Sequence, residues 1–153
     1  IGNAYGHGSS DANSVVEGER NRLTIIQEGT NNGVVAVQRG SDNTISAEQK
    51  GTNNYLLLLQ KGKNNSVSGY SQENTSHKML LETVIQVGED LSLNTSDVSK
   101  SKPYGNTFMQ TGANLSLQVN NEFANTLGGI EINQTGHDMK VVVDQSFFSF
   151  PMN

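Results

Sequence analysis

The sequence predicts an all-β fold, a β-solenoid of about six two-strand rungs with about 22 residues in each rung. Three observations support this prediction: a motif recurs every 11 residues, apolar and polar residues alternate within each repeat, and amides and glycines are unusually frequent. The chain has 153 residues, including 19 Asn, 10 Gln and 16 Gly, and only 33 % of its residues are hydrophobic. We therefore expect one domain with a thin core.

The repeat is most regular between residues 21 and 65, where it reads N-x5-Q-x-G-x2-N. Successive glutamines are 11 residues apart, and each is followed by a glycine and then an asparagine at constant offsets. Weaker units extend the pattern on both sides, so the predicted repeat domain covers residues 10–146. Residues 1–9 form a Gly- and Ser-rich leader segment, and residues 147–153 form an aromatic tail.

The spacing of the units predicts how they pair into rungs. In the weaker units the glutamine position falls on Val16, Ser71, Gln86, Asp97, Gln110, Asn121, Gln134 and Gln145. Units then pair as 16/27, 38/49, 60/71, 86/97, 110/121 and 134/145, with 11 residues inside each pair and the longer gaps only between pairs. We expect a tight turn inside each rung and connections of variable length between rungs.

Each unit alternates as a half-buried strand does. In the first regular strand Leu23 and Ile25 share a face with Gln27, whereas Arg22 and Thr24 lie on the opposite face. A helix is disfavoured because β-branched residues are frequent and a Gly/Asn cluster interrupts every unit. The register of residues 72–105 stays open, since it places the acidic Glu82 on the inward face.

The recurring amides and glycines are predicted to be structural. Inward amides can stack on their counterparts in the next rung and form ladders, which satisfy buried polar groups and demand strict register. The predicted ladder residues are Asn21, Gln27, Asn32, Gln38, Asn43, Gln49, Asn54, Gln60, Gln86, Gln110, Gln134 and Gln145. The glycines and asparagines of G-x-x-N are expected to supply positive φ angles at the turns. The predicted turn glycines are Gly18, Gly29, Gly40, Gly51, Gly62, Gly88, Gly112 and Gly136.

The ends of the predicted solenoid bear on its function. A stack of rungs ends in an open strand edge unless something covers it. Neither terminal segment shows the periodicity of a capping helix. Edges of matching shape predict that one subunit templates the next, with cross-β stacking into a fibre and a second copy of the chain as the partner.

Composition and motifs argue against other classes of function. A net charge of −5 disfavours a nucleic-acid surface, and no stretch has the roughly 18 apolar residues of a membrane helix. The absence of Cys excludes disulfides and thiolate metal sites. We expect no catalytic residue, metal or cofactor, because His7, His77 and His137 are far apart and no phosphate loop, G-x-S-x-G motif or calcium repeat is present.

Four apolar residues fall on the predicted outer face, where they form a patch. They are Val35, Val37, Leu57 and Leu59. The patch fits three arrangements: lateral packing of fibres, contact with the aromatic tail, or cover by a loop.

The arrangement N-x5-Q-x-G-x2-N-x-A-x3-Q resembles the curlin repeat of bacterial curli, most closely over Asn32–Gln49. The resemblance implies a β-solenoid subunit that is exported through an outer-membrane channel and assembles on the cell surface into the extracellular amyloid of biofilms. It also implies two roles, a major fibre subunit and a minor nucleating subunit, and the full set of paired units favours the major one. Residues 1–9 would correspond to the family's secretion-targeting leader, in a chain whose signal peptide has been removed.

The preferred interpretation is therefore a structural, non-enzymatic subunit that polymerises into curli-like fibres used in adhesion and surface colonisation. Its expected partners are itself, a nucleator subunit and an outer-membrane secretion channel, with no nucleic acid and no membrane insertion. The alternatives are the nucleator itself, or a monomeric β-solenoid binding module of the adhesin or ice-binding type. Regular ranks of Thr would support ice binding, and the repeats lack them. An enzyme on a β-helix is the least supported reading, because it needs clustered carboxylates.

Overall fold

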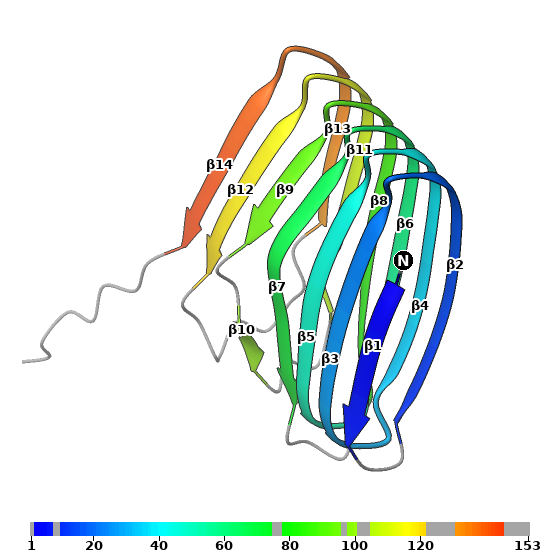
Figure 1. Cartoon of the computed structure of the whole chain (residues 1–153). Helices are drawn as coiled ribbons and strands as arrows, with labels where there is room; N and C mark the ends of the chain where they lie inside the picture. The colour runs from blue at the N-terminus through cyan, green and yellow to red at the C-terminus, as the bar shows by residue number, and fades with distance from the viewer. Residues whose placement is uncertain are drawn as a thin grey trace, which may run out of the picture.

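The structure is a computed structural model, and it describes residues 2–7, 10–74, 78–95, 98–100, 105–121 and 131–145. Every regular element in these residues is a β-strand, and the strands form two sheets that face each other (Figure 1). All strand pairings are parallel, as in a solenoid. The predicted β-solenoid is therefore confirmed, whereas the stacking of subunits into a fibre stays a prediction.

Consecutive strands alternate between the two sheets. Sheet A contains, in spatial order, β1 (Gly2–His7), β3 (Arg22–Thr30), β5 (Thr44–Thr52), β7 (Ser66–Asn74), β9 (Ser92–Thr95), β12 (Ser116–Asn121) and β14 (Lys140–Gln145), with β10 (Val98–Lys100) beside β7. Sheet B contains β2 (Asp11–Glu19), β4 (Gly33–Ser41), β6 (Asn54–Lys63), β8 (Leu80–Glu89), β11 (Thr107–Ala113) and β13 (Glu131–His137). A rung is one sheet B strand and the sheet A strand that follows it, such as β2 and β3.

The two corners of the solenoid differ in their connections. Inside each rung two residues join the strands, for example Arg20 and Asn21 between β2 and β3. Between rungs the connection varies from Asn53 alone, between β5 and β6, to residues 122–130 between β12 and β13. Variable connections thus gather at one corner, as the spacing predicts.

One extra residue nevertheless lies inside a rung. The register of β7 against β5 shifts after Ile45, where Ser68 and Gly69 together lie opposite Ser46 in a β-bulge. Gly69 has a φ of 69°, a conformation that glycine adopts without a Cβ penalty. The bulge places Gln72 opposite Gln49, so the prediction of Ser71 at this position is wrong.

The fourth rung is also irregular in sheet A. Strand β9 pairs with β7 only over Ser66–Ser68, and β10 then pairs with Ser71–Glu73. In this register Ser99 lies opposite Gln72, where the spacing predicts Asp97. Asp97 itself lies outside the described residues.

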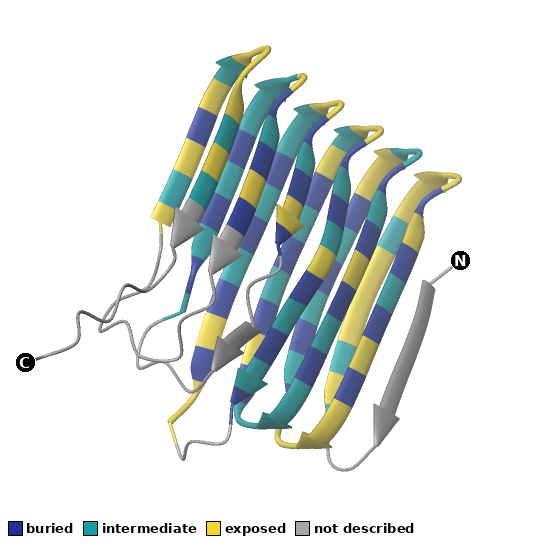
Figure 2. Ribbon diagram, turned by 90° about the vertical axis from the view of Figure 1, so that its left-hand side faces the viewer, coloured by how far each residue is buried: buried dark blue, intermediate teal, exposed yellow. Residues whose placement is uncertain are grey.

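A thin core fills the space between the sheets. Buried and more exposed residues alternate along the strands, which Figure 2 shows as dark-blue bands between teal and yellow ones. Leu23, Ile45 and Val67 lie opposite one another on successive sheet A strands, and each is at most 2 % exposed. Apolar columns of this kind run from rung to rung, so each rung is covered by its neighbours.

Strand β1 extends sheet A beyond the first rung. Gly2–His7 run parallel to Leu23–Glu28 of β3, so the predicted leader segment contributes a strand to the sheet. The terminal strands are therefore β1 and β2 at one end of the solenoid and β13 and β14 at the other (Figure 1).

Replacing Gly40 with alanine tests the geometry of the turns. Gly40 has a φ of 118°, and a Cβ there would lie 1.9 Å from the carbonyl oxygen of Gly62. Because backbone conformation and space both oppose a side chain, Gly40→Ala should lower the free energy of unfolding by more than about 2 kcal/mol in urea titrations. Gly33→Ala is the matched control, since Gly33 lacks a positive φ and its Cβ would meet the exposed Tyr55 ring instead of a backbone carbonyl. Equal losses in the two variants would contradict this account.

Candidate functional site

The features that recur from rung to rung are buried amides, turn glycines and polar turn side chains. Within the described part of the chain, no group of three or more His, Asp or Glu side chains could hold a metal ion. No helix of that part is long and apolar enough to cross a membrane. The candidate site therefore consists of the residues that repeat from rung to rung.

Five glutamines form a continuous column in sheet B. The Nε2 of Gln38 donates to Oε1 of Gln60 at 2.9 Å, and Gln60 donates to Gln86 at 2.8 Å. The column continues from Gln86 to Gln110 at 2.7 Å and from Gln110 to Gln134 at 2.8 Å. All five side chains are at most 1 % exposed. The side-chain hydrogen bonds thus run along the stacking axis.

Each glutamine of the column also donates an N–H to the opposite sheet. Gln38 donates to the carbonyl oxygen of Arg22, and Gln60 donates to that of Thr44, both at 3.0 Å. An amide group has two donor hydrogens, and this arrangement uses both of them. The glutamines therefore link neighbouring rungs and also tie sheet B to sheet A.

The corresponding column in sheet A is shorter. Gln27 donates to Gln49 at 2.9 Å, and Gln49 donates to Gln72 at 2.7 Å. The sequence analysis missed Gln72, although it is itself a glutamine, because the bulge moves it one residue out of the 11-residue spacing. Gln145 lies in β14 opposite Asn121, and its side chain is outside the described residues.

The repeat asparagines close the turns. Asn21 Nδ2 donates to the carbonyl oxygens of Glu17 at 2.8 Å and Gly40 at 2.9 Å, and its Oδ1 accepts the backbone N–H of Asn43 at 3.0 Å. The other predicted ladder asparagines also donate from Nδ2 to the backbone carbonyl oxygen four residues earlier in the chain. They are Asn32, Asn43 and Asn54. Asn65, which the predicted ladder omitted, is fully buried and makes the same contacts.

The turn glycines take the positive φ angles expected of them. All eight predicted glycines have φ between 90° and 145°. The prediction that the motif asparagine shares this conformation is wrong: Asn31, with φ 57°, precedes the motif residue Asn32. A Cβ on Gly112 would lie 1.8 Å from the carbonyl of Gly136, whereas the nearest atom to one on Gly136 is Met139 Sδ at 3.4 Å. In sheet B the crowding of glycines therefore ends at the terminal rung, whereas in sheet A the row of glycines ends at Gly51, opposite Asn74.

A buried acid interrupts the apolar core in the irregular middle of the chain. Glu82 is 1 % exposed, so its predicted inward position is correct. Tyr70 donates its hydroxyl to Oε2 of Glu82 at 2.8 Å, and Asn106 Nδ2 donates to Oε1 at 3.1 Å. The sequence analysis missed both partners, because the bulge in β7 and the long connection before β11 hide their register.

A second polar column follows the corner with the two-residue turns, and we call it the turn column. It consists of the first turn residue of each rung, namely Arg20, Asp42, Asn64, Asp90, Asn114 and Asp138, all with φ between 52° and 57°. Arg20 donates to both carboxylate oxygens of Asp42, at 2.5 and 2.9 Å. Asn64 donates to Asp90 at 2.6 Å, and Asn114 donates to Asp138 at 2.8 Å. Donors and carboxylates therefore alternate along the column.

The first pair of the turn column stays ionised. The hydrogen bond from Arg20 holds the pKa of Asp42 below its usual value, and the same bond raises the pKa of Arg20. The lowered pKa means that Asp42 stays a carboxylate to a lower pH than usual. The ion pair is lost only when the pH falls far enough to protonate Asp42, because Arg20 keeps its proton throughout.

The outer face of sheet B carries an apolar row. Val15, Val37, Leu59, Ile85 and Met109 lie opposite one another on successive strands. The four outer-face residues predicted from the sequence are half-buried there, at positions 35, 37, 57 and 59. The predicted contact with the aromatic tail lies outside the described residues.

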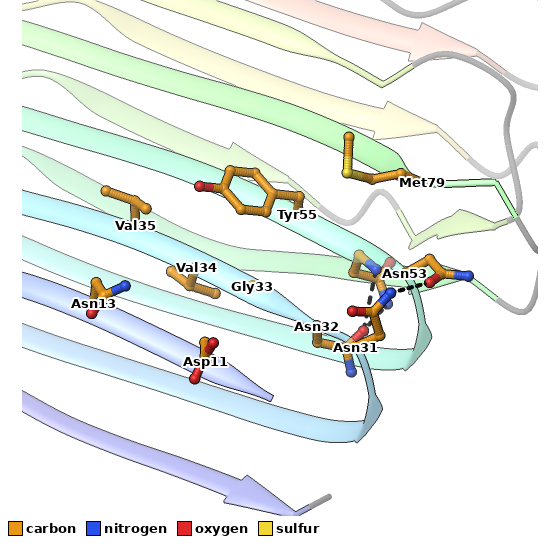
Figure 3. Close-up of a pocket in the computed structure, with 11 residues that line it drawn as sticks. Asp11, Asn13, Asn31, Asn32, Gly33, Val34, Val35, Asn53, Tyr55 and Met79 are labelled. Atoms are coloured by element: carbon orange, nitrogen blue, oxygen red, sulfur yellow. Dashed lines mark hydrogen bonds between the residues drawn. The ribbon is translucent and has the colours of Figure 1, made fainter. Parts of the chain in front are cut away.

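A shallow hollow of about 380 Å³ interrupts this face at Gly33, which has no side chain. Tyr55 and Val35 line it on the strands, and Asn31 and Asn53 line it at the turn (Figure 3). The hollow combines an aromatic ring with amide groups, two of which, Asn31 and Asn53, hydrogen-bond to each other.

Residues 18–51 fit the family model described as the curlin associated repeat. The matched segment begins at Gly18 and includes all of β3 and β4 and most of β5, and it contains Gln27, Gln38 and Gln49 of the glutamine columns. No curated protein and no solved structure matches the chain.

Completing the sheet B column should stabilise the protein. Gln38 Oε1 is buried without a hydrogen-bond partner, because Val16 occupies the glutamine position opposite it on β2. Since an unsatisfied buried acceptor is costly, Val16→Gln should raise the free energy of unfolding by about 1 kcal/mol in denaturant titrations. Val15→Gln places the same amide on the outer face and should give no such gain. A loss of stability in Val16→Gln would count against the ladder as a stabilising element.

Proposed function

Because this chain is a curlin-family repeat protein, we propose that it is a structural subunit which assembles end to end into extracellular amyloid fibres. The support comes from the family of the repeat together with a solenoid whose strands are parallel and stacked in register. Amyloid fibres grow by adding strands in register to the end of such a stack. The proposed fibre continues, between subunits, the stacking found inside one subunit.

The observation that supports the proposal most directly is that the solenoid ends in strands with an unpaired edge. Strands β13 and β14 are terminal in their sheets, and β2 is terminal in sheet B at the other end. An unpaired strand edge presents a row of backbone N–H and C=O groups that a further strand can bind. In the inner rungs of sheet B, each turn glycine faces the carbonyl oxygen of the glycine on the next rung. Gly136 faces no such carbonyl in the described residues, so a further rung fits over it.

Apolar side chains at the ends provide a driving force for association. Ile132, Val141 and Val143 of the last rung are only partly buried, although they pack against the core. Val16 of the first rung is in the same state. A docked copy would cover the exposed part of these side chains, and removal of apolar surface from water favours association.

The wider biological role follows from the family and is part of the proposal. Residues 10–146 would form the fibre body, residues 1–9 would direct export through an outer-membrane channel, and residues 147–153 would form a tail. A nucleator subunit would start the fibre, which would serve a biofilm matrix in adhesion and surface colonisation. We assign this chain to the major subunit because its paired units run through most of the sequence.

Two alternatives lead to different observations. A nucleator would form fibres less readily than it seeds those of another subunit. A monomeric binding module would stay unassembled and use a ligand site, for which the hollow beside Gly33 and Tyr55 is the best candidate in the described residues.

Electron microscopy and fibre diffraction test the proposal. Purified protein in neutral buffer without denaturant should form long fibres with a reflection near 4.7 Å along the fibre axis, the strand spacing of a stacked sheet. Fragments of these fibres should then shorten the lag of fresh protein. A stable monomer at high concentration would refute the proposed assembly and favour the binding module.

Replacing Gln49 with leucine tests the role of the amide columns in assembly. The change removes the acceptor of Gln27 and the donor to Gln72, and unsatisfied buried groups cost roughly 1–3 kcal/mol each. We expect Gln49→Leu to form fibres more slowly and to give fibres that dissolve at lower denaturant concentration. Ser46→Leu adds the same side chain on the outer face of the same strand and serves as the control. Unchanged assembly of Gln49→Leu would show that the column is dispensable.

A further inference from the structure

We propose that the turn column selects a head-to-tail contact between copies, and that Asp138 of one copy pairs with Arg20 of the next. This inference deepens the proposed function and rests on it. It names the surface that joins two copies and the residues that give the joint its direction.

The turn column never places two carboxylates on adjacent rungs. From the first rung to the last, its members read as donor, acid, donor, acid, donor, acid. Rungs are about 4.8 Å apart, so stacked carboxylates would repel each other along the corner. The alternation removes this repulsion inside the subunit.

The two ends of the column are complementary. The first member, Arg20, is a cation whose side chain is 66 % exposed, and the last, Asp138, is an exposed anion. Inside the subunit Gly18 lies opposite Gly40 and Gly112 lies opposite Gly136. Continuing this register places Gly136 of one copy opposite Gly18 of the next, and therefore Asp138 opposite Arg20.

The hydrogen-bonding capacity of both groups allows the new pair. Asn114 uses only Oδ1 of Asp138, which leaves Oδ2 as an acceptor. Arg20 donates through Nε and Nη2 to Asp42 and through Nη1 to Glu19. Because a guanidinium group has five N–H donors, two remain for the incoming carboxylate. The joint would repeat the Arg20–Asp42 contact already found between the first two rungs.

The opposite orientations lack this complementarity. Joining two first rungs with their turn corners aligned would bring Arg20 close to Arg20, and joining two last rungs in the same way would bring Asp138 close to Asp138. Like charges at the rung spacing disfavour both, so the column acts against the wrong contacts as well as for the right one.

The rest of the joint adds one favourable and two unfavourable features. The same register places Val141 opposite Leu23 and Val143 opposite Ile25, which extends the apolar columns. It also places Lys140 opposite Arg22, but both side chains are exposed and long enough to diverge. Strand β1 occupies the edge of β3 that β14 of the second copy would need. The turn column and sheet B can therefore engage first, and sheet A pairs after β1 has left β3.

Charge reversal at each end tests the joint. We expect Asp138→Arg and Arg20→Glu, each alone, to elongate wild-type seeds about tenfold more slowly at low salt, with a smaller deficit at high salt. In an equimolar mixture the two variants can alternate, since Arg at position 138 then meets Glu at position 20 and Asp138 meets Arg20. The mixture should elongate at close to the wild-type rate. Circular dichroism of each variant reports whether it is folded.

Asp90→Arg is the matched control. It makes the same substitution in the same column and loses the equivalent bond from Asn64, but it lies inside the subunit. It should elongate faster than Asp138→Arg. Two results would overturn the assigned joint, provided that wild-type fibres still form. In one, the mixture elongates as slowly as each variant alone. In the other, Asp90→Arg elongates as slowly as Asp138→Arg. Failure of the wild type to elongate would overturn the proposed function itself.

Discussion

Each position in this fold lies almost directly over the same position one rung away, and this constraint governs the chemistry of every repeated residue. Glutamine tolerates it because its amide is both donor and acceptor, so identical side chains bond to one another. Glycine is required at the turns because the next rung's carbonyl occupies the place of a Cβ. Short carboxylates stacked at the turns would repel each other, and the turn column alternates them with donors.

The same constraint explains how much could be predicted from the sequence. A repeat of constant length reports directly on the rungs, so the inward face, the pairing of units and the turn glycines follow from spacing alone. Prediction failed where one residue is added inside a rung. The bulge at Gly69 places Gln72 where the 11-residue spacing predicts Ser71, and the spacing alone does not reveal the extra residue. The pairing of β1 with β3 could not be foreseen, since the leader segment lacks the motif.

The two sheets have different roles in the interior. Sheet B carries an unbroken column of five glutamines, whereas the described sheet A column ends at Gln72, where the neighbouring strand is interrupted. Near that interruption the core contains the polar cluster of Tyr70, Glu82 and Asn106, with Phe108 in edge contact with the Tyr70 ring. Satisfied polar groups thus occupy the region where regular stacking stops.

The difference between the two corners has a consequence for engineering. One corner allows only two residues per turn, while the other already accommodates connections of unequal length, such as the one between β7 and β8. A foreign peptide grafted into that connection would leave the register of both sheets unchanged, because loops that join packed strands tolerate insertion. In a fibre of the proposed kind the grafted peptide would appear once per subunit, roughly every 29 Å along the fibre for six rungs of about 4.8 Å.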